Sequence, residues 1–363
     1  MENNNAQFTI TVNNLDIDNY GGVILPITGE DFFKKSGFNM LDIVDVDISG
    51  HKAICPIVPD YNYIDSGVCA ISPVNGMEKE IFLLAIGGQF AVLTELAKRT
   101  KNGWVVNPTL KFPLEVKFSL NTKDGYRETF EIYAYLFARR SNNREDYPEL
   151  NDAEYCNFRT VTGGSIKPGI LFRTSNPLKP RFKRNWYSDK ECEKAGISKF
   201  INISENQNEI DTYKNNPEYE KSYCLKQEIL ANCVPADYKD EYFLECFKNA
   251  LLFMAKDKRK SVIHCMEGKD RTGYMVAVLQ ALMGATTKEI MEDYSKSHCN
   301  FFKVNLKDHT MPLIQRQIID YLNDNLGGNI NDNNLTSKAN EYLLNIGLNP
   351  AEVQQIKRYL RGE

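Results

Sequence analysis

Up to about Arg140, the chain alternates short runs of β-branched, apolar or aromatic residues with polar breaks rich in Gly, Pro, Asn and Asp. Runs of this length and composition are typical of β-strands joined by turns. We expect strands at 8–12, 22–27, 40–48, 52–58, 80–86, 114–120 and 127–138. Asp124-Gly125, before the last run, is typical of a hairpin turn. One helix is expected near 89–99.

After residue 152 the pattern changes, because short apolar runs now alternate with helical stripes. Buried strands are predicted at 169–174, 199–204 and 261–265, and helices at 242–254, 273–283, 286–297, 312–325, 335–347 and 349–362. Capping residues mark several of these helix starts, such as Asn349 followed by Pro350. Alternation of strands and helices predicts an α/β domain with a central, mostly parallel sheet and, here, a helical C-terminus.

The polar stretch 139–152 separates the two patterns and is typical of a linker or a long loop. A chain of 363 residues is long enough for two domains, each with its own core. We therefore expect two domains. The first, residues 1–145, is all-β, a barrel or sandwich of unknown role, and the second, residues 153–363, is the α/β domain.

The composition excludes several classes of protein. The net charge of −4 provides no general basic field, so no nucleic acid partner is expected. No run approaches the roughly 20 apolar residues of a spanning helix. The N-terminus has no recognisable secretory signal, so we expect a soluble, cytoplasmic protein without an integral membrane segment, and export stays open. The oligomeric state does not follow from the sequence.

The nine cysteines form an odd set without a CxxC pair, which indicates reduced thiols rather than a disulfide framework. His298 and Cys299 are adjacent, but no second pair stands at metal-ligand spacing. We therefore expect neither a metal site nor a cofactor.

The segment 260–279 carries the most specific chemistry. A predicted strand delivers His264 and Cys265 to its C-terminal end, and Arg271 opens the next helix. In open α/β sheets, ligands bind where strands end and helices begin. Inward-facing backbone N–H groups bind an anion there, and an arginine fork matches two phosphate oxygens. Cysteine in such surroundings is typically a nucleophilic thiolate, so we predict attack by Cys265 on phosphorus and a phosphocysteine intermediate.

Other residues of the loop have supporting roles. Asp270 is the candidate general acid and later base, although a cap for the following helix is the alternative, and Asp237 and Asp240 are the alternative acids. Thr272 is expected to hydrogen-bond the sulfur, and His264 to orient the loop. Lys269 would add a point charge suited to a second phosphate or an acidic neighbourhood. The predicted substrate-binding residues are Met266, Glu267, Gly268, Lys269, Gly273 and Arg173.

These residues resemble the signature of the cysteine-dependent phosphatase superfamily, HCx5R followed by Ser or Thr and then Gly, which is complete from His264 to Gly273. The portion GKDRTG is similar, more narrowly, to the bacterial tyrosine-phosphatase-like family. Segments 157–178, 289–297 and 340–360 are also similar to that family, so the resemblance covers about residues 155–363. It implies a hydrolase of the protein tyrosine or dual-specificity phosphatase type, with Lys269 and Asp270 in catalysis and Arg173 as the family's strand-end arginine.

Two departures from that family bear on the substrate. Asn202, Ile203 and Ser204 stand where the family usually has Asp-Leu-Arg, and Glu267 stands where it usually has a small residue. Glu267 would repel a phosphate dianion if it pointed into the pocket, and acidic substrates if it pointed outward. Residues 50–93 faintly resemble the C-terminal β-domain of S-adenosylmethionine hydroxide adenosyltransferases, which implies architecture only, with substrate docking or oligomerisation as the expected role.

The sequence thus predicts an enzyme that hydrolyses phosphomonoesters, with a phosphoprotein or a phosphoinositide or inositol phosphate as its partner. The alternative is a phosphate-binding pseudophosphatase without turnover. A third hypothesis, a redox or arsenate-reducing enzyme, needs a resolving thiol such as Cys299 or Cys233. The basic run 179–187 has interleaved aromatics and is either a solvated face or a docking site for acidic lipids or phosphopeptides.

Overall fold

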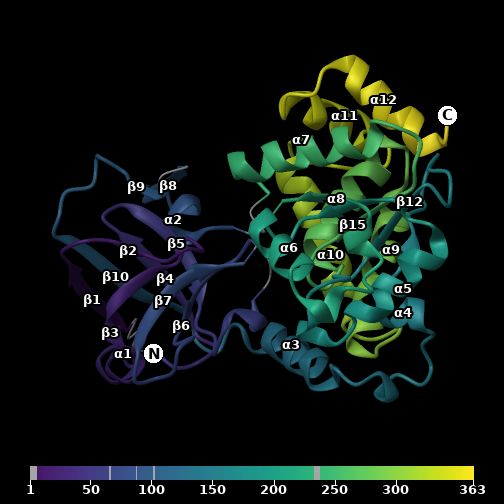
Figure 1. Cartoon of the computed structure of the whole chain (residues 1–363). Coiled ribbons are helices and arrows are strands. Elements are labelled where there is room, and N and C mark those ends of the chain that lie inside the picture. Colours follow the sequence, from purple (N-terminus) through teal and green to yellow (C-terminus); the bar gives the residue numbers. More distant parts are fainter. Residues whose placement is uncertain (1–5, 65–66, 87, 101–102, 233–237) are drawn as a thin grey trace. The chain divides into compact units, whose positions relative to one another are not determined.

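The computed structural model describes residues 6–64, 67–86, 88–100, 103–232 and 238–363. The chain divides into two compact units, residues 1–138 and 139–363 (Figure 1). The first unit is rich in β-strands, and the second combines one sheet with many helices.

The N-terminal unit is built on two antiparallel four-stranded sheets. Alternation explains the strands: in the segment 43–48, Val44 and Val46 are buried while Asp45 between them is exposed. Buried residues of both sheets join in one core, to which Phe32 and Phe118 contribute. The expectation of a β-rich unit is therefore confirmed. In sheet order the strands are β1 (Gln7–Val12), β10 (Leu114–Thr122), β4 (Ile43–Ile48) and β5 (His51–Pro56), then β2 (Asp16–Ile17), β3 (Val23–Thr28), β7 (Glu80–Ala85) and β6 (Cys69–Ser72), with a separate pair β8 (Ala97–Thr100) and β9 (Gly103–Val106).

The prediction that this unit is all-β is wrong, because it also contains helices. Helix α1 (Gly29–Ser36) begins where the Thr28 hydroxyl accepts a hydrogen bond from the Asp31 N–H. The predicted strand 127–138 is helix α3 (Arg127–Arg139), so Asp124-Gly125 leads into a helix and not a hairpin. The rings of Phe130 and Phe137, seven residues apart on one helix face, both contact Tyr63.

The helix expected at 89–99 is also shorter than predicted. Helix α2 covers only Phe90–Leu93, and the chain continues into strand β8. Glu95 has a left-handed backbone with φ of 57°, which a continuing α-helix does not permit.

The C-terminal unit contains a five-stranded sheet in the order β11 (Arg159–Thr160), β12 (Leu171–Thr174), β15 (Ser261–His264), β13 (Lys199–Asn202) and β14 (Glu228–Ala231). Strands β12, β15, β13 and β14 run parallel, and β11 is antiparallel to β12. This confirms the expected mostly parallel sheet. Strand β15 pairs on both sides, and all four of its residues are buried.

Helices surround this sheet. Phe172, Phe200 and Val262 pack on one face with residues of α5 and α6, and α7 packs against β13. The predicted caps of α9 and α12 are present, with Thr286 and Asn349 each accepting from the N–H three residues on. Among the described residues, no helix has the length and apolar character needed to cross a bilayer. The helices are α4 (Asp152–Tyr155), α5 (Asn185–Ala195), α6 (Gln207–Lys214), α7 (Glu241–Ala255), α8 (Asp270–Leu282), α9 (Thr287–Phe302), α10 (Met311–Asn325), α11 (Leu335–Asn345) and α12 (Pro350–Arg361), with 3₁₀ turns at Tyr61–Tyr63, Arg144–Asp146, Pro180–Phe182, Pro217–Tyr219 and Cys224–Lys226.

The stretch 139–152, expected as a linker or loop, is irregular but firmly packed in the C-terminal unit. Tyr147 is fully buried, and its hydroxyl donates to the Phe301 carbonyl at 2.9 Å. Arg144 donates to the carbonyls of Tyr147 and Leu150. The Tyr147 contact ties the stretch to α9, and the Arg144 contacts hold the stretch together.

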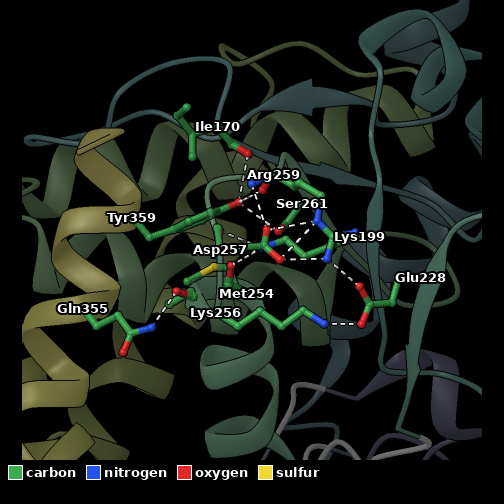
Figure 2. Close-up of polar contacts among 11 residues, drawn as sticks. Ile170, Lys199, Glu228, Met254, Lys256, Asp257, Arg259, Ser261, Gln355 and Tyr359 are labelled. Atoms are coloured by element: carbon green, nitrogen blue, oxygen red, sulfur yellow. Dashed lines mark hydrogen bonds and ion pairs between the residues drawn. The ribbon is translucent and has the colours of Figure 1, made fainter.

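A polar cluster fastens α12 to the edge at which the strands begin (Figure 2). The ammonium of Lys199, at the start of β13, donates to the Met254 carbonyl at 2.6 Å and pairs with Asp257 at 3.1 Å. The Tyr359 hydroxyl contacts Ser261 Oγ at 2.8 Å and the carbonyls of Ile170 and Arg259. Since ligands of parallel sheets bind at the opposite edge, where strands end, this cluster has a structural role.

We predict that Tyr359→Phe lowers the free energy of unfolding by about 1–2 kcal/mol, because buried polar atoms around the hydroxyl lose their partner. Urea unfolding of the full chain measures this. Gln354→Ala, on the exposed side of the same helix, is the control and should be close to neutral. Equal stability of Tyr359→Phe and the wild type would contradict the structural role of the cluster.

Candidate active site

The loop between β15 and α8 lies at the C-terminal end of the central strand. Cys265 directly follows β15 and is 3% exposed, and α8 begins five residues later at Asp270. The Gly273 N–H donates to the Lys269 carbonyl at 2.8 Å, which starts the helix. Since the first N–H groups of a helix have no partner within it, Cys265 and Arg271 lie beside a set of donors suited to an anion.

Two glycines allow this loop to lie close to its neighbours. Gly268 has a φ of +66°, and a Cβ there would lie 2.2 Å from the Thr174 carbonyl oxygen. A Cβ on Gly273 would lie 2.6 Å from the Tyr294 ring. Packing therefore requires glycine at both of these predicted substrate-binding positions. A larger residue at Gly268 would displace the loop from β12, and one at Gly273 would displace α8 from α9.

Arg173 supports the loop from the protein interior. The side chain is fully buried, and Nη2 donates to the carbonyls of Gly268 at 2.9 Å and Lys269 at 3.4 Å. Its Nη1 donates to Asp293 Oδ2 at 2.6 Å. Burial lowers the pKa of Arg173 to about 10, so the group stays charged at neutral pH. We predicted Arg173 as a substrate-binding residue, but the structure commits its guanidinium to the loop backbone.

Asp293 of α9 links Arg173 to a second arginine. Arg159 Nε donates to Asp293 Oδ1 at 2.8 Å, and the pair is mostly buried. Burial raises the pKa of Asp293, but the two guanidinium groups outweigh it and hold it at about 2. Asn157 Nδ2 donates to the Glu267 carbonyl at 3.1 Å. Sequence reasoning missed Asp293, because nothing local in α9 distinguishes it from other helical acids.

Lys269 lies between two carboxylates. Its Nζ is 3.3 Å from Glu267 Oε2 and 3.5 Å from Asp270 Oδ2. The ring of Phe302 lies 4.9 Å from the ammonium and that of Phe301 5.8 Å. Burial lowers the pKa of Lys269, but Asp270 and Glu267 outweigh burial and raise it above its ordinary value. The Glu267 side chain therefore points to Lys269. The sequence had left the direction of this side chain open.

Asp270 is the first residue of α8 and does not cap it. Its Oδ1 accepts from the Tyr294 hydroxyl at 3.2 Å and lies 3.9 Å from His298 Nε2. Burial raises the pKa of Asp270, but Lys269, His298 and Tyr294 outweigh burial and hold it below its ordinary value. Of the alternative acids, Asp240 caps α7 and Asp237 lies outside the described residues.

His264 and Thr272 are buried beside the nucleophile. Burial lowers the pKa of His264 to about 3, so its ring is neutral. The Cys265 backbone opposes this shift of the His264 pKa. Within the described part of the chain, the Thr272 hydroxyl has no hydrogen-bond partner. The expected hydrogen bond from Thr272 to the sulfur is thus not formed here, whereas the role of His264 in orienting the loop stays a prediction. Met266, the remaining predicted residue, accepts from the Asn176 N–H at 3.2 Å through its carbonyl.

The segment 202–204, which departs from the family pattern, contacts Arg271, the residue predicted to bind the phosphate oxygens. Arg271 Nη1 donates to the Ile203 carbonyl at 3.0 Å. Two residues on, Glu205 is fully buried and accepts from Asn176 and Asn202, each at 2.8 Å, and from Tyr213 at 3.0 Å. Neutral amide and hydroxyl donors thus satisfy a buried carboxylate next to the clamp. Sequence reasoning missed Glu205, whose partners come together only in the fold.

Two other predictions concern metals and thiols. Among the described residues, no cluster of three His, Cys, Asp or Glu side chains could hold a metal ion. Burial raises the pKa of Cys299 to about 11, and its sulfur lies 4.0 Å from that of Met311. Cys233, the other candidate resolving thiol, lies outside the described residues.

The basic run 179–187 is divided between the interior and the surface. Arg184 is buried, with its guanidinium 4.3 Å from the Tyr155 ring centre and 4.5 Å from that of Phe301. Arg181 and Lys183 are exposed. The central arginine of the run is therefore structural.

We predict that Arg173→Lys weakens binding of inorganic phosphate by about tenfold, because an ammonium cannot serve Asp293 and the loop carbonyls together. Isothermal titration calorimetry of the full chain measures this. Arg358→Lys, on an exposed position of α12, is the matched control. Unchanged phosphate affinity in Arg173→Lys would show that the loop does not depend on this support.

The chain was compared with families of known proteins, with curated proteins and with solved structures. Solved structures that share a likeness are the catalytic core of Siw14 (17% identity, 52% of this chain and 93% of that chain, TM-score 0.28) and TpbA of P. aeruginosa (10%, 45% and 96%, TM-score 0.25). A third is an uncharacterised conserved protein from Thermotoga maritima (15%, 31% and 36%, TM-score 0.24), of which this chain therefore spans about a third. No curated protein matches the chain. Residues 188–362 match the model of the tyrosine phosphatase family, and the chain thus carries a cysteine-dependent enzyme domain of the tyrosine-phosphatase type.

Proposed function

We propose that the C-terminal unit hydrolyses phosphomonoesters through a phosphocysteine intermediate, on phosphotyrosine or on a phosphoinositide or inositol phosphate. One observation carries this proposal: the loop from β15 to α8 places Cys265 beside the N-terminus of a buried helix, with Arg271 in its first turn. Phosphate oxygens would bind the N–H groups of that turn and the Arg271 fork. The bond from Arg271 to the Ile203 carbonyl would fix the orientation of the fork.

The first step transfers the phosphoryl group to the enzyme. The Cys265 thiolate attacks phosphorus, the S–P bond forms and the P–O bond of the ester breaks. The departing oxygen takes a proton from Asp270. In the second step Asp270 takes a proton from water, whose oxygen attacks phosphorus, and the S–P bond breaks to release inorganic phosphate and the thiolate.

The surroundings of Asp270 constrain the first step. Because the pKa of Asp270 lies below its ordinary value, the carboxyl is ionised in the free enzyme at neutral pH. A bound phosphate dianion would raise the pKa of this neighbouring carboxyl by like-charge repulsion. Proton donation therefore depends on the substrate and on mildly acidic pH, whereas the second step uses the carboxylate form directly.

A phosphate-binding module without turnover is the second candidate function. It is favoured by Glu267, whose carboxylate lies in the loop and pairs with Lys269. A negative charge there weakens a site that must hold a dianion through two chemical steps. For the N-terminal unit we keep substrate docking or oligomerisation as the proposed role.

We expect the wild type to hydrolyse p-nitrophenyl phosphate between about pH 5 and 7 with EDTA present, and Cys265→Ser to lose about a thousandfold or more in kcat. Release of p-nitrophenolate measures both. Phosphate binding retained by Cys265→Ser is the control for folding. A folded wild type that binds phosphate without turnover would replace the enzyme with the binding module.

We expect Asp270→Asn to reduce kcat/KM about a hundredfold for phenyl phosphate and much less for p-nitrophenyl phosphate, because only the poorer leaving group needs the proton. If Asp270 is the acid, kcat/KM of the wild type falls as pH rises above the lowered pKa of Asp270, and the variant loses this slope. Steady-state profiles from pH 4 to 7 measure it. Equal losses for both esters would exclude Asp270 as the acid.

A further inference from the structure

Glu267 is a charged loop residue to which the proposed reaction assigns no role. Its side chain is 21% exposed, and its carboxylate lies 3.3 Å from the Lys269 ammonium. Lys269 is itself 11% exposed, with Asp270 on its other side at 3.5 Å and the Phe302 ring at 4.9 Å. The ammonium is thus enclosed by two carboxylates and an aromatic surface.

The charge of Glu267 also acts on a second buried cation, Arg184. Burial lowers the pKa of Arg184, and the neighbouring hydroxyls of Tyr147 and Tyr155 and the carboxylate of Glu267 oppose the shift. The Phe301 ring lies 4.5 Å from the Arg184 guanidinium and 5.8 Å from the Lys269 ammonium. Glu267 is therefore the ion-pair partner of Lys269, and its charge also favours the charged form of Arg184.

The net charge of Glu267, Lys269 and Asp270 affects how a second phosphate can approach this part of the loop. Lys269 contributes +1, and Glu267 and Asp270 contribute −1 each, so the three side chains carry a net charge of −1. With Glu267 neutral, the sum would be zero and the ammonium would lack its nearer partner. A phosphate near Lys269 must therefore displace Glu267, or meet its negative charge at short range.

We propose that Glu267 is a specificity-determining residue that holds Lys269 and selects substrates with a single phosphate and an uncharged flank, as in aryl phosphates such as phosphotyrosine. This inference rests on the proposed phosphatase function and narrows its substrate class. The reacting phosphate uses Arg271 and the backbone N–H groups, whereas the Glu267 carboxylate pairs with Lys269. A second phosphate would require Lys269, which Glu267 occupies.

The test compares two substrates in one pair of proteins. The ratio of kcat/KM for inositol hexakisphosphate to kcat/KM for p-nitrophenyl phosphate is measured for the full-length wild type and for Glu267→Gln. We expect the ratio to rise about tenfold in the variant, because removal of one negative charge favours the polyanion far more than the monoester. The gain should shrink at high salt, which screens the added attraction.

Two further variants make the test specific. Lys269→Met in the Glu267→Gln background should cancel the gain, since the proposal assigns it to the released ammonium. Glu341→Gln, on an exposed position of α11, removes the same charge elsewhere and should leave the ratio unchanged. If Glu267→Gln folds poorly, Glu267→Ala takes its place in the test and should also raise the ratio.

The outcomes separate this inference from the proposed function. A ratio unchanged in Glu267→Gln, or a gain that persists in Lys269→Met, overturns the role of Glu267 while hydrolysis of p-nitrophenyl phosphate still supports the phosphatase. A wild type without turnover overturns the phosphatase. In that case the ratio of dissociation constants for inositol hexakisphosphate and inorganic phosphate, measured by calorimetry in the same variants, supports or overturns the charge selection.

Discussion

The ionic group of Arg159, Asp293 and Arg173 is the interaction on which the rest of the site depends. A fully buried guanidinium is costly unless it is paired and its donors are satisfied. Asp293 supplies the charge for Arg173, and the carbonyls of Gly268 and Lys269 accept two further contacts. The position of the loop, and with it that of Cys265, therefore depends on an ion pair between β12 and α9.

The two edges of the parallel sheet have different roles: the edge where strands begin stabilises the fold, and the edge where strands end carries the candidate site. At the edge where strands begin, Lys199, Asp257 and Tyr359 join the strands to the last helix (Figure 2). At the edge where strands end, Arg271 in the first turn of α8 donates to the Ile203 carbonyl, which follows β13. A firmly bonded edge and an edge that carries the N-terminus of α8 give the domain one rigid base and one place for an anion.

The N-terminal unit shows where a periodic pattern is ambiguous. In the run 127–138, every position from 132 onward is apolar or aromatic, so a period of two and a period of 3.6 fit almost equally well. Packing in the fold favours the helix over the strand, because Phe130 and Phe137 share a helix face that contacts Tyr63. The strands with strict alternation, such as 43–48, were predictable because one face meets the core and the other meets water.

For the C-terminal unit, local sequence was sufficient for three of the four parallel strands, all but β14, and for most helices and the order of Cys265, Asp270 and Arg271, because periodicity, caps and loop spacing act over a few residues. The sequence also singled out Arg173, but it did not indicate which groups the Arg173 guanidinium contacts. Only the tertiary structure decided that Arg173 turns to the loop backbone, that Glu267 pairs with Lys269, and that Asp293 and Glu205 belong to the site. Each of these depends on contacts between distant segments, whose geometry is set by packing of the whole sheet and its helices and not by neighbouring residues.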